Sequence, residues 1–370
     1  MNEQNQDVLD IREYVKIATK KIEEFKKTKV RCAIIGRSGT GKSSLINAII
    51  GKDVLDTGPV ETTMEVSEPI EHGGLIFYDL PGCSTQKFPR SKYFERFKIK
   101  NFDCVIVATS DRFTEDDHFL VNELISAKVP VYAIRTKIDI SVDDELKKKN
   151  KPEVETLNLI RNDLIQNLKG YRVQGIYLTS ADYPLRYDLD KLLKDIYNKL
   201  TSHKRRRFIA DVNITSKFIL DEKRKTADSV VVWYSAAAAA NGLNPIPGLD
   251  ISVDAGILVK LGHELERIYG LDNLNDTFLS KHLEGKIGLQ LLGKASQFAS
   301  KYLGKEAILL LLKRAGVNIA AKSASKFIPI LGYLVAAGIG YKMTKSVGDE
   351  MVKDASGLAQ EVFNAIKKEY

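Results

Sequence analysis

A glycine-rich segment with a lysine and a serine at fixed spacing could bind the phosphates of a nucleotide. Residues 36–43 read Gly-Arg-Ser-Gly-Thr-Gly-Lys-Ser, which matches the phosphate-loop pattern G-x-x-x-x-G-K-S. The glycines would let backbone N–H groups approach phosphate oxygens, and a following helix would add the positive end of its dipole. Lys42 would reach the β- and γ-phosphates, and the Ser43 hydroxyl would hold Mg2+. The expected nucleotide-binding residues of this segment are Gly36, Arg37, Ser38, Gly39, Thr40, Gly41, Lys42, Ser43 and Ser44.

A carboxylate and a pair of threonines could complete a magnesium and phosphate site. Residues 79–82 read Asp-Leu-Pro-Gly, the D-x-x-G pattern, in which Asp79 would bind Mg2+ through water and the Gly82 N–H would sense the γ-phosphate. The polar stretch 51–67 should form a first switch, where Thr62 or Thr63 would bind Mg2+ and the γ-phosphate. Two adjacent threonines leave the register open, with a slight preference for Thr62. The expected metal ligands are Ser43, Thr62 and Asp79, and the expected catalytic residues are Lys42, Thr62, Asp79 and Gly82.

A further pattern could read the base of the nucleotide. Thr136-Lys-Ile-Asp139 fits the guanine-reading pattern N/T-K-x-D. The Asp139 carboxylate can accept both the N1–H and the N2 amino protons of guanine, a donor pair that adenine lacks. The Lys137 stem would lie over the base, and Ser180-Ala181 would offer a backbone N–H to guanine O6. The Thr136–Asp139 pattern alone is more often a simple turn, but four such segments in the required order indicate a guanine-nucleotide site.

Each of these segments follows a short apolar run that is typical of a buried strand. The runs cover residues 30–35, 75–78, 103–108, 129–134 and 175–178, with another short strand at 68–71. Helices are expected at 44–50, 152–168 and 189–200, and a lysine-rich loop is expected at 147–151. Ligands of open parallel sheets bind at the carboxyl ends of the strands. Residues 30–200 therefore predict an α/β P-loop GTPase domain with a mostly parallel central sheet.

The rest of the chain has the pattern of helices. Residues 1–29 carry apolar side chains at spacings of three and four, and residues 201–370 show no strand signal. We expect the N-terminal helix to pack against the C-terminal half, so that the two form one all-α helical domain. The prolines of 244–248 predict a loop. The apolar stretch 327–341 is shorter than a bilayer span, which favours a buried helix hairpin over insertion into one membrane leaflet.

Composition narrows the class of protein. The chain has 370 residues, a length that favours two folded units, and a net charge of +8. Its three cysteines form no C-x-x-C pair, which favours a reducing cytosol. The N-terminus has no apolar core, and residue 2 is Asn, so neither a signal peptide nor N-myristoylation is expected. The basic run 203–207 is expected to be a solvated helix start or linker, with acidic lipid or a partner as the alternative. An RNA-associated GTPase ranks last because the basic residues do not alternate with aromatic ones, and no nucleic acid is expected as a partner.

The chain resembles the immunity-related GTPases, the interferon-inducible p47 family. The resemblance rests on the leading helix, the three G-domain motifs above and a helical C-terminal half with Pro-Ile-Pro-Gly at 245–248. It implies GTP hydrolysis, self-association through G domains that depends on GTP or GDP, and cell-autonomous defence at intracellular membranes such as those of pathogen-containing vacuoles. Because its phosphate loop carries Lys42, the chain resembles the lysine-bearing effector branch of the family and not the methionine-bearing regulatory branch. The implied location is cytoplasmic, with peripheral association with intracellular membranes, although permanent anchoring is in doubt without a glycine at position 2.

One position of the expected site departs from many GTPases. Cys83 follows D-x-x-G, where a Gln often orients the attacking water. Assistance should then come from elsewhere, such as a residue or the nucleotide ribose of a second G domain. One hypothesis is a GTPase that turns over faster on self-association, and the other is a nucleotide-dependent scaffold with negligible turnover. The set of Lys42, Ser43 and Asp79 favours the first, and Cys83 favours the second.

Overall fold

A computed structural model describes residues 3–55, 68–82, 90–240, 250–274, 283, 285–323 and 332–369. The chain divides into two compact units. Thr28–Ile219 forms an α/β unit, and Met1–Lys27 joins Leu220–Glu369 in a helical unit. The division at residue 219 differs from the expected domain boundary at residue 200.

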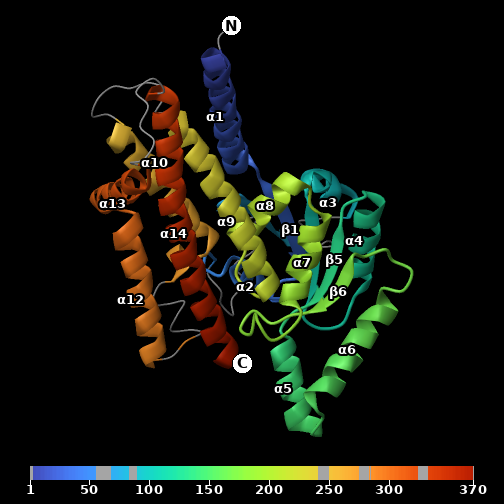
Figure 1. Ribbon diagram of the computed structural model, residues 1–370. Coiled ribbons are helices and arrows are strands. Elements are labelled where there is room, and N and C mark those ends of the chain that lie inside the picture. The colour runs from blue at the N-terminus through green and yellow to red at the C-terminus, as the bar shows by residue number, and fades with distance from the viewer. Residues whose placement is uncertain are drawn as a thin grey trace. The chain divides into compact units, whose positions relative to one another are not determined.

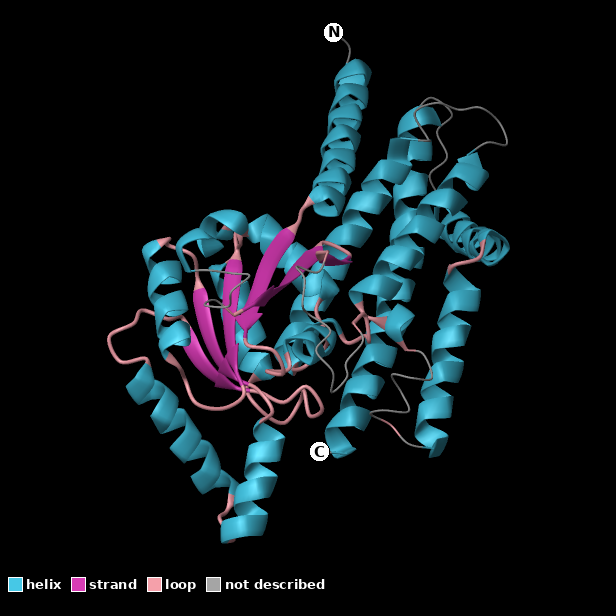
Figure 2. Ribbon diagram, turned by 180° about the vertical axis from the view of Figure 1, so that it is seen from behind, coloured by secondary structure: helices cyan, strands magenta, loops and turns pink. Residues whose placement is uncertain are grey.

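Within its described residues, the α/β unit is built on a six-stranded sheet (Figures 1 and 2). The strands are β1 (Val30–Gly36), β2 (Ile70–His72), β3 (Leu75–Pro81), β4 (Cys104–Thr109), β5 (Val131–Arg135) and β6 (Gly175–Leu178). Their order is β2-β3-β1-β4-β5-β6, and all neighbours are parallel except the antiparallel pair β2 and β3. The mostly parallel sheet expected from the sequence is confirmed. In the register of β1 on β3, Gly36 stands opposite Pro81, so the phosphate loop begins beside Gly82.

Helices cover both faces of the sheet, which explains why its strands are apolar on both sides. One face packs under α2 (Lys42–Ile50), α7 (Leu189–Lys199) and α8 (Ser202–Asp211). The other packs under α3 (Arg90–Arg96), the short turn η1 (Ile99–Asn101) and α4 (Glu115–Ser126). The central strand β4 is buried along its whole length. The core therefore holds the carboxyl ends of the strands in a fixed arrangement.

Two helices connect β5 to β6 and form a hairpin whose tip projects beyond the sheet, while the second helix packs against β6 (Figures 1 and 2). They are α5 (Ile138–Lys149) and α6 (Glu153–Asn167). The prediction of a loop at 147–151 is wrong for residues 147–149, which form the last turn of α5. Aspartate and glutamate side chains one turn earlier pair with these lysines, for example Asp144 with Lys148 at 2.9 Å. Pairs at this spacing support a helix, and the loop itself begins at Asn150.

Helix α8 explains why the α/β unit extends beyond residue 200. Its Phe208 and Ile209 are buried in the same cluster as the sheet. Buried Arg207 and Asp211 form a bidentate pair, and Asp211 Oδ2 also accepts the Gly74 N–H at 2.7 Å. A Cβ on Gly74 would lie 2.3 Å from the Arg207 side chain, so only glycine fits in the turn between β2 and β3.

The basic run 203–207 is therefore part of the fold and not simply a solvated segment. Besides the buried Arg207, Lys204 pairs with Asp103 at 2.6 Å. Arg205 donates to the carbonyls of Tyr197 at 3.0 Å and Asn198 at 2.6 Å. Lys204, Arg205 and Arg207 are thus bonded within the α/β unit, and the His203 ring lies 3.4 Å from the Thr201 hydroxyl. Because these cations are buried or paired, few side chains of the run are available to bind acidic lipid headgroups.

The helical unit contains α1 and the C-terminal helices. Its described elements are α1 (Glu3–Lys27), most of α9 (Lys217–Ala238), α10 (Asp250–Ile268), the turn η3 (Leu271–Asn273), α12 (Gly285–Tyr302), α13 (Lys305–Ser323) and α14 (Gly332–Glu369). Phe25 of α1 packs edge-on against Trp233 of α9, with ring centroids 6.0 Å apart. Four residues of α10 at spacings of three and four are fully buried and form its core face: Leu258, Leu261, Leu265 and Ile268.

The apolar stretch 327–341 is only partly described. Residues 332–341 form the first turns of α14, and the remainder of the stretch, like the proline loop at 244–248, lies outside the described residues. Among the described helices, none has both the length and the apolar character that a membrane crossing requires.

Candidate functional site

The phosphate loop joins the end of β1 to the start of α2. Gly39 and Gly41 take φ angles of 78° and 77°, the left-handed region that side chains disfavour. Helix α2 begins at Lys42, immediately after Gly41. The first N–H groups of a helix have no partner within it, so they are available to an anion held by this loop. Among the other expected residues of the loop, Ser38 is exposed and Ser44 is half-buried.

Hydrogen bonds to a single carbonyl close the loop on itself. The Arg37 carbonyl accepts the Thr40 N–H at 3.3 Å, the Thr40 hydroxyl at 2.8 Å and the Lys42 ammonium at 3.2 Å. Thr40 and Lys42 are both buried. These bonds fix the loop as a cradle, with Lys42 turned toward its interior.

Lys42, Ser43 and Asp79 converge although they come from two different strand ends. The Ser43 hydroxyl donates to Asp79 Oδ2 at 3.0 Å, and Lys42 Nζ lies 3.6 Å from Asp79 Oδ1. The Lys42 and Asp79 side chains are each only 4% exposed. Asp79 Oδ1 is buried and has no hydrogen-bond partner among the residues that the structure describes. A buried carboxylate oxygen without a donor is costly, which indicates that a cation or a ligand group completes this site.

The donor set fits magnesium. Mg2+ prefers oxygen ligands and usually takes only one or two from the protein, the remainder coming from water and substrate phosphates. Ser43 Oγ and the Asp79 carboxylate supply two such oxygens at one point. Thr62 and Thr63, the candidates for a further ligand, and Cys83 lie outside the described residues.

Gly82 lies beside the start of the phosphate loop. A Cβ at Gly82 would lie 3.5 Å from Arg37 Cγ and 3.6 Å from the Arg37 backbone nitrogen. The Arg37 guanidinium extends to the segment after β4, where Nη2 donates to Asp111 Oδ1 at 2.6 Å. The structure thus brings Gly82 to the phosphate loop and adds Asp111, which sequence reasoning missed because the contact joins residues far apart in the chain.

The guanine box is bonded directly to the phosphate loop. The Thr136 hydroxyl donates to the Thr40 carbonyl at 2.5 Å and to the Thr109 carbonyl at 3.2 Å. Lys137 takes a left-handed φ of 54°, and its Cε lies 3.5 Å from the Cβ position of Gly41. The Lys137 stem therefore runs alongside the loop. Asp139 is half-buried in the first turn of α5.

The segment after β6 meets this box. The Thr179 carbonyl accepts the Ile138 N–H at 3.2 Å, and the buried Ser180 hydroxyl accepts the Tyr183 N–H at 3.2 Å. Ala181 is half-buried against the core. The four expected motif segments therefore lie at one edge of the sheet, at the carboxyl ends of β1, β3, β5 and β6 (Figure 1).

Asp188 fixes the segment that contains Ser180 and Ala181. Its carboxylate accepts the Leu178 N–H at 3.0 Å, Arg161 at 2.5 Å and Lys191 at 2.6 Å. Burial would raise the pKa of Asp188, but these three donors together hold that pKa below its ordinary value. Nearby, burial raises the pKa of Tyr187 to about 12, and Glu153 and Asp139 contribute in the same direction. Tyr187 therefore stays neutral beside the guanine box.

Asn47 anchors the start of the expected first switch. Its Oδ1 accepts the N–H groups of Val54 and Leu55, both at 3.1 Å, and its Nδ2 donates to the Leu55 carbonyl at 2.9 Å. Sequence reasoning missed this residue. The available signal was one polar side chain within the apolar run 45–50, because a buried amide needs partners.

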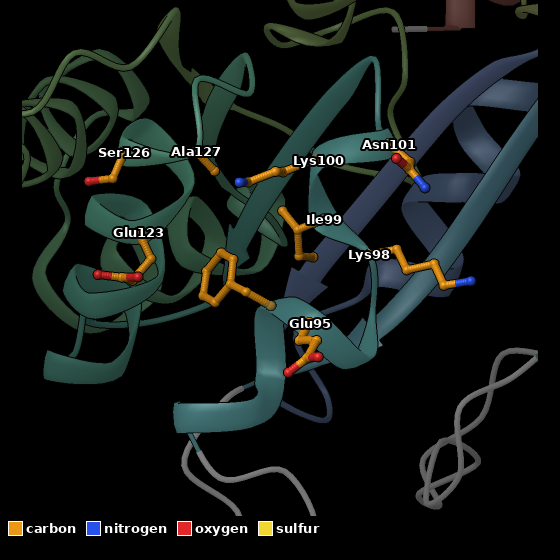
Figure 3. Close-up of a pocket in the computed structure, with 9 residues that line it drawn as sticks. Glu95, Lys98, Ile99, Lys100, Asn101, Glu123, Ser126 and Ala127 are labelled. Atoms are coloured by element: carbon orange, nitrogen blue, oxygen red, sulfur yellow. The ribbon is translucent and has the colours of Figure 1, made fainter.

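A separate pocket of about 570 Å³ lies between α3, η1 and α4 (Figure 3). Phe94 and Ile99 line it together with charged side chains such as Glu95, Lys100 and Glu123. None of its lining residues belongs to the phosphate or guanine segments. The pocket is therefore not part of the nucleotide site.

Comparisons with known proteins agree with these motifs. A family model described as interferon-inducible GTPase (IIGP) matches residues 4–341. Interferon-inducible GTPase 5 of Bos taurus is 28% identical over 89% of this chain and 74% of its own length. Interferon-gamma-inducible GTPase 10 of Mus musculus is 24% identical over 94% of this chain and 85% of its own length. A crystal structure of Toc33 from Arabidopsis thaliana aligns with 46% of this chain and 79% of that one, at 15% identity and a TM-score of 0.33.

Proposed function

The chain belongs to the interferon-inducible GTPase family and is a GTPase. On this premise we propose that it uses Mg2+, that self-association through the α/β unit accelerates its turnover, and that it acts at intracellular membranes in cell-autonomous defence. The observation that supports the nucleotide chemistry is the convergence of Lys42, Ser43 and Asp79, whose buried Oδ1 lies near the Lys42 ammonium but accepts no hydrogen bond from the described residues.

The phosphate loop would bind and orient the triphosphate. Its N–H groups and the start of α2 would hold phosphate oxygens, and Lys42 would exchange its contact with Asp79 for the β- and γ-phosphates. Ser43 and Asp79 would hold Mg2+, which neutralises developing negative charge on the phosphates when it is bound. Gly82 would donate its N–H to the γ-phosphate, and Thr62 would add a ligand from the first switch.

Selectivity for guanine would come from Asp139. Its carboxylate is held in the first turn of α5, and the Ile138 N–H ties that turn to the segment of Ser180 and Ala181. A site that hydrogen-bonds two donors of guanine discriminates strongly against adenine, because adenine would leave the carboxylate without partners.

Self-association is the proposed source of faster hydrolysis. The position that often carries a water-orienting Gln is Cys83. A second copy of the chain could supply the missing stabilisation of transition-state charge in trans. The test is the rate of GTP hydrolysis per molecule over a wide range of protein concentration, with Lys42→Ala as the control. A rate per molecule that rises with concentration supports the proposal. A flat, near-zero rate with tight guanine-nucleotide binding would instead indicate a scaffold.

Membrane association is proposed as peripheral, with the chain otherwise in the cytoplasm. The net charge of +8 would favour an anionic surface. Co-sedimentation with anionic vesicles at low and high salt tests this, because electrostatic binding weakens as salt screens the charges. RNA in place of vesicles serves as the comparison.

A further inference from the structure

Arg37 is the second residue of the phosphate loop and lies close to the end of β3. Its stem lies beside Gly82, with Cγ 3.5 Å from the Cβ position of that residue. Its guanidinium points to the segment after β4 and contacts Asp111 at 2.6 Å and the Arg112 carbonyl at 3.4 Å. A strong cation is thus attached next to the residue assigned to the γ-phosphate.

The contact that holds Arg37 is weak enough to exchange. The Arg37 and Asp111 side chains are 45% and 65% exposed, and ion pairs at such positions contribute little to stability. Asp111 also has a second cation in reach. Burial lowers the pKa of the Arg135 guanidinium, and attraction to Asp111 partly opposes that effect. Arg135 Nε is buried and finds no hydrogen-bond partner in the described part of the chain. Asp111 would therefore keep a cationic neighbour if Arg37 moved.

We propose that Arg37 leaves Asp111 when GTP binds and donates hydrogen bonds to the γ-phosphate of the nucleotide in its own phosphate loop, as a catalytic residue of hydrolysis. The planar fork of a guanidinium matches two phosphate oxygens at once. This assignment supplies a charge that the loop would otherwise draw from Lys42 alone.

In this step Arg37 contributes only its positive charge and its hydrogen-bond donors, and it forms no covalent bond. A water oxygen forms a bond to the γ-phosphorus while the bond to the β–γ bridging oxygen breaks. The electron pair of that bond leaves with GDP, and the phosphate product takes a proton from the water. Negative charge grows on the oxygens around the γ-phosphorus, so a cation fixed there stabilises the transition state more than the bound substrate. Arg37 is not consumed.

Three variants test the proposal. Arg37→Ala should lower kcat about 100-fold or more and change the affinity for GDP less than about threefold. The kcat of Arg37→Lys should lie between those of the parent and of Arg37→Ala, because an ammonium keeps the charge but lacks the planar pair of donors. Asp111→Asn should raise kcat about two- to fivefold, because it releases Arg37 from an exposed pair. Binding of GDP with aluminium fluoride, a transition-state analogue, should be lost in Arg37→Ala and retained in Asp111→Asn.

Two results would overturn the proposal. One is an Arg37→Ala variant whose kcat stays within about threefold of the parent. The other is an Asp111→Asn variant that loses kcat as fully as Arg37→Ala, which would make the pair a structural clamp. The proposal rests on GTP hydrolysis and not on self-association. All rates are therefore measured at one dilute and one high protein concentration. If Arg37→Ala is slow and the rate per molecule does not depend on protein concentration, the self-association proposal alone is refuted. If Arg37→Ala is as fast as the parent and the rate per molecule rises with concentration, the Arg37 proposal alone is refuted.

Discussion

The Ser43 hydroxyl donates a hydrogen bond to the Asp79 carboxylate at 3.0 Å, across 36 positions of the sequence. The bond joins the start of α2 to the end of β3, because β1 and β3 are parallel neighbours with Gly36 opposite Pro81. It places the two expected magnesium ligands at one point. The other Asp79 oxygen is buried 3.6 Å from Lys42 Nζ and accepts no hydrogen bond from any described residue.

Ser43→Ala should weaken magnesium-dependent nucleotide binding. We expect the affinity for GTP in Mg2+ to fall about tenfold or more, toward the value that the parent shows with a chelator. Titration with a fluorescent GTP analogue, with and without Mg2+, measures this. Ser141→Ala, on α5, is the matched control and should behave as the parent. A Ser43→Ala variant with undiminished magnesium dependence would contradict the assignment.

Asp139→Asn should change which base is bound. The amide offers one acceptor and one donor, which suits the N1–H and the C2 carbonyl of xanthine and not the two donors of guanine. We expect the affinity for GTP to fall about 100-fold or more and the affinity for XTP to rise. Competition binding with GTP, XTP and ATP measures the order. Unchanged selectivity for GTP would place the base elsewhere.

Asp211→Asn should destabilise the α/β unit. It leaves the buried Arg207 without its bidentate partner and weakens the bond to the Gly74 N–H. Breaking a buried pair in this way typically costs about 3–5 kcal/mol in the free energy of unfolding. Urea unfolding followed by circular dichroism measures it. Asp144→Asn, which removes an exposed pair on α5, should leave the midpoint unchanged, and equal midpoints for all three proteins would refute the role of α8.

Asp188 should make stability depend on acid pH. The donors around it hold its pKa in the folded protein below the value of about 3.9 in the unfolded chain. The unfolded chain then binds the proton more readily, so this contribution is complete above that value and is lost as pH falls through the folded pKa. Asp188→Asn should lower stability at pH 7 and flatten its decline between about pH 5 and pH 2. Unfolding midpoints across that range measure both effects, and parallel curves for parent and variant would contradict the assignment.

The motif segments could be predicted from sequence because each is local. A glycine loop between strand and helix, or a polar turn after an apolar run, carries its own signal, and the parallel sheet then gathers these segments at one edge. The last turn of α5 was predicted as a loop because it is a run of lysines. The acidic side chains one turn earlier, which pair with these lysines, were not considered. The structure divides the chain at residue 219 and not at residue 200, because Arg207 and Asp211 of α8 pack on Gly74, which is distant from them in sequence. Asp111 was missed for the same reason.

The most direct measurement is the hydrolysis of GTP and of ATP by the purified chain in Mg2+, in parallel with Lys42→Ala. We expect GTP to be hydrolysed in preference to ATP by about 100-fold or more, and the activity to be lost in the variant, which still folds and keeps an intact guanine box. Equal rates for the two nucleotides, or a Lys42→Ala variant as active as the parent, would contradict the site described.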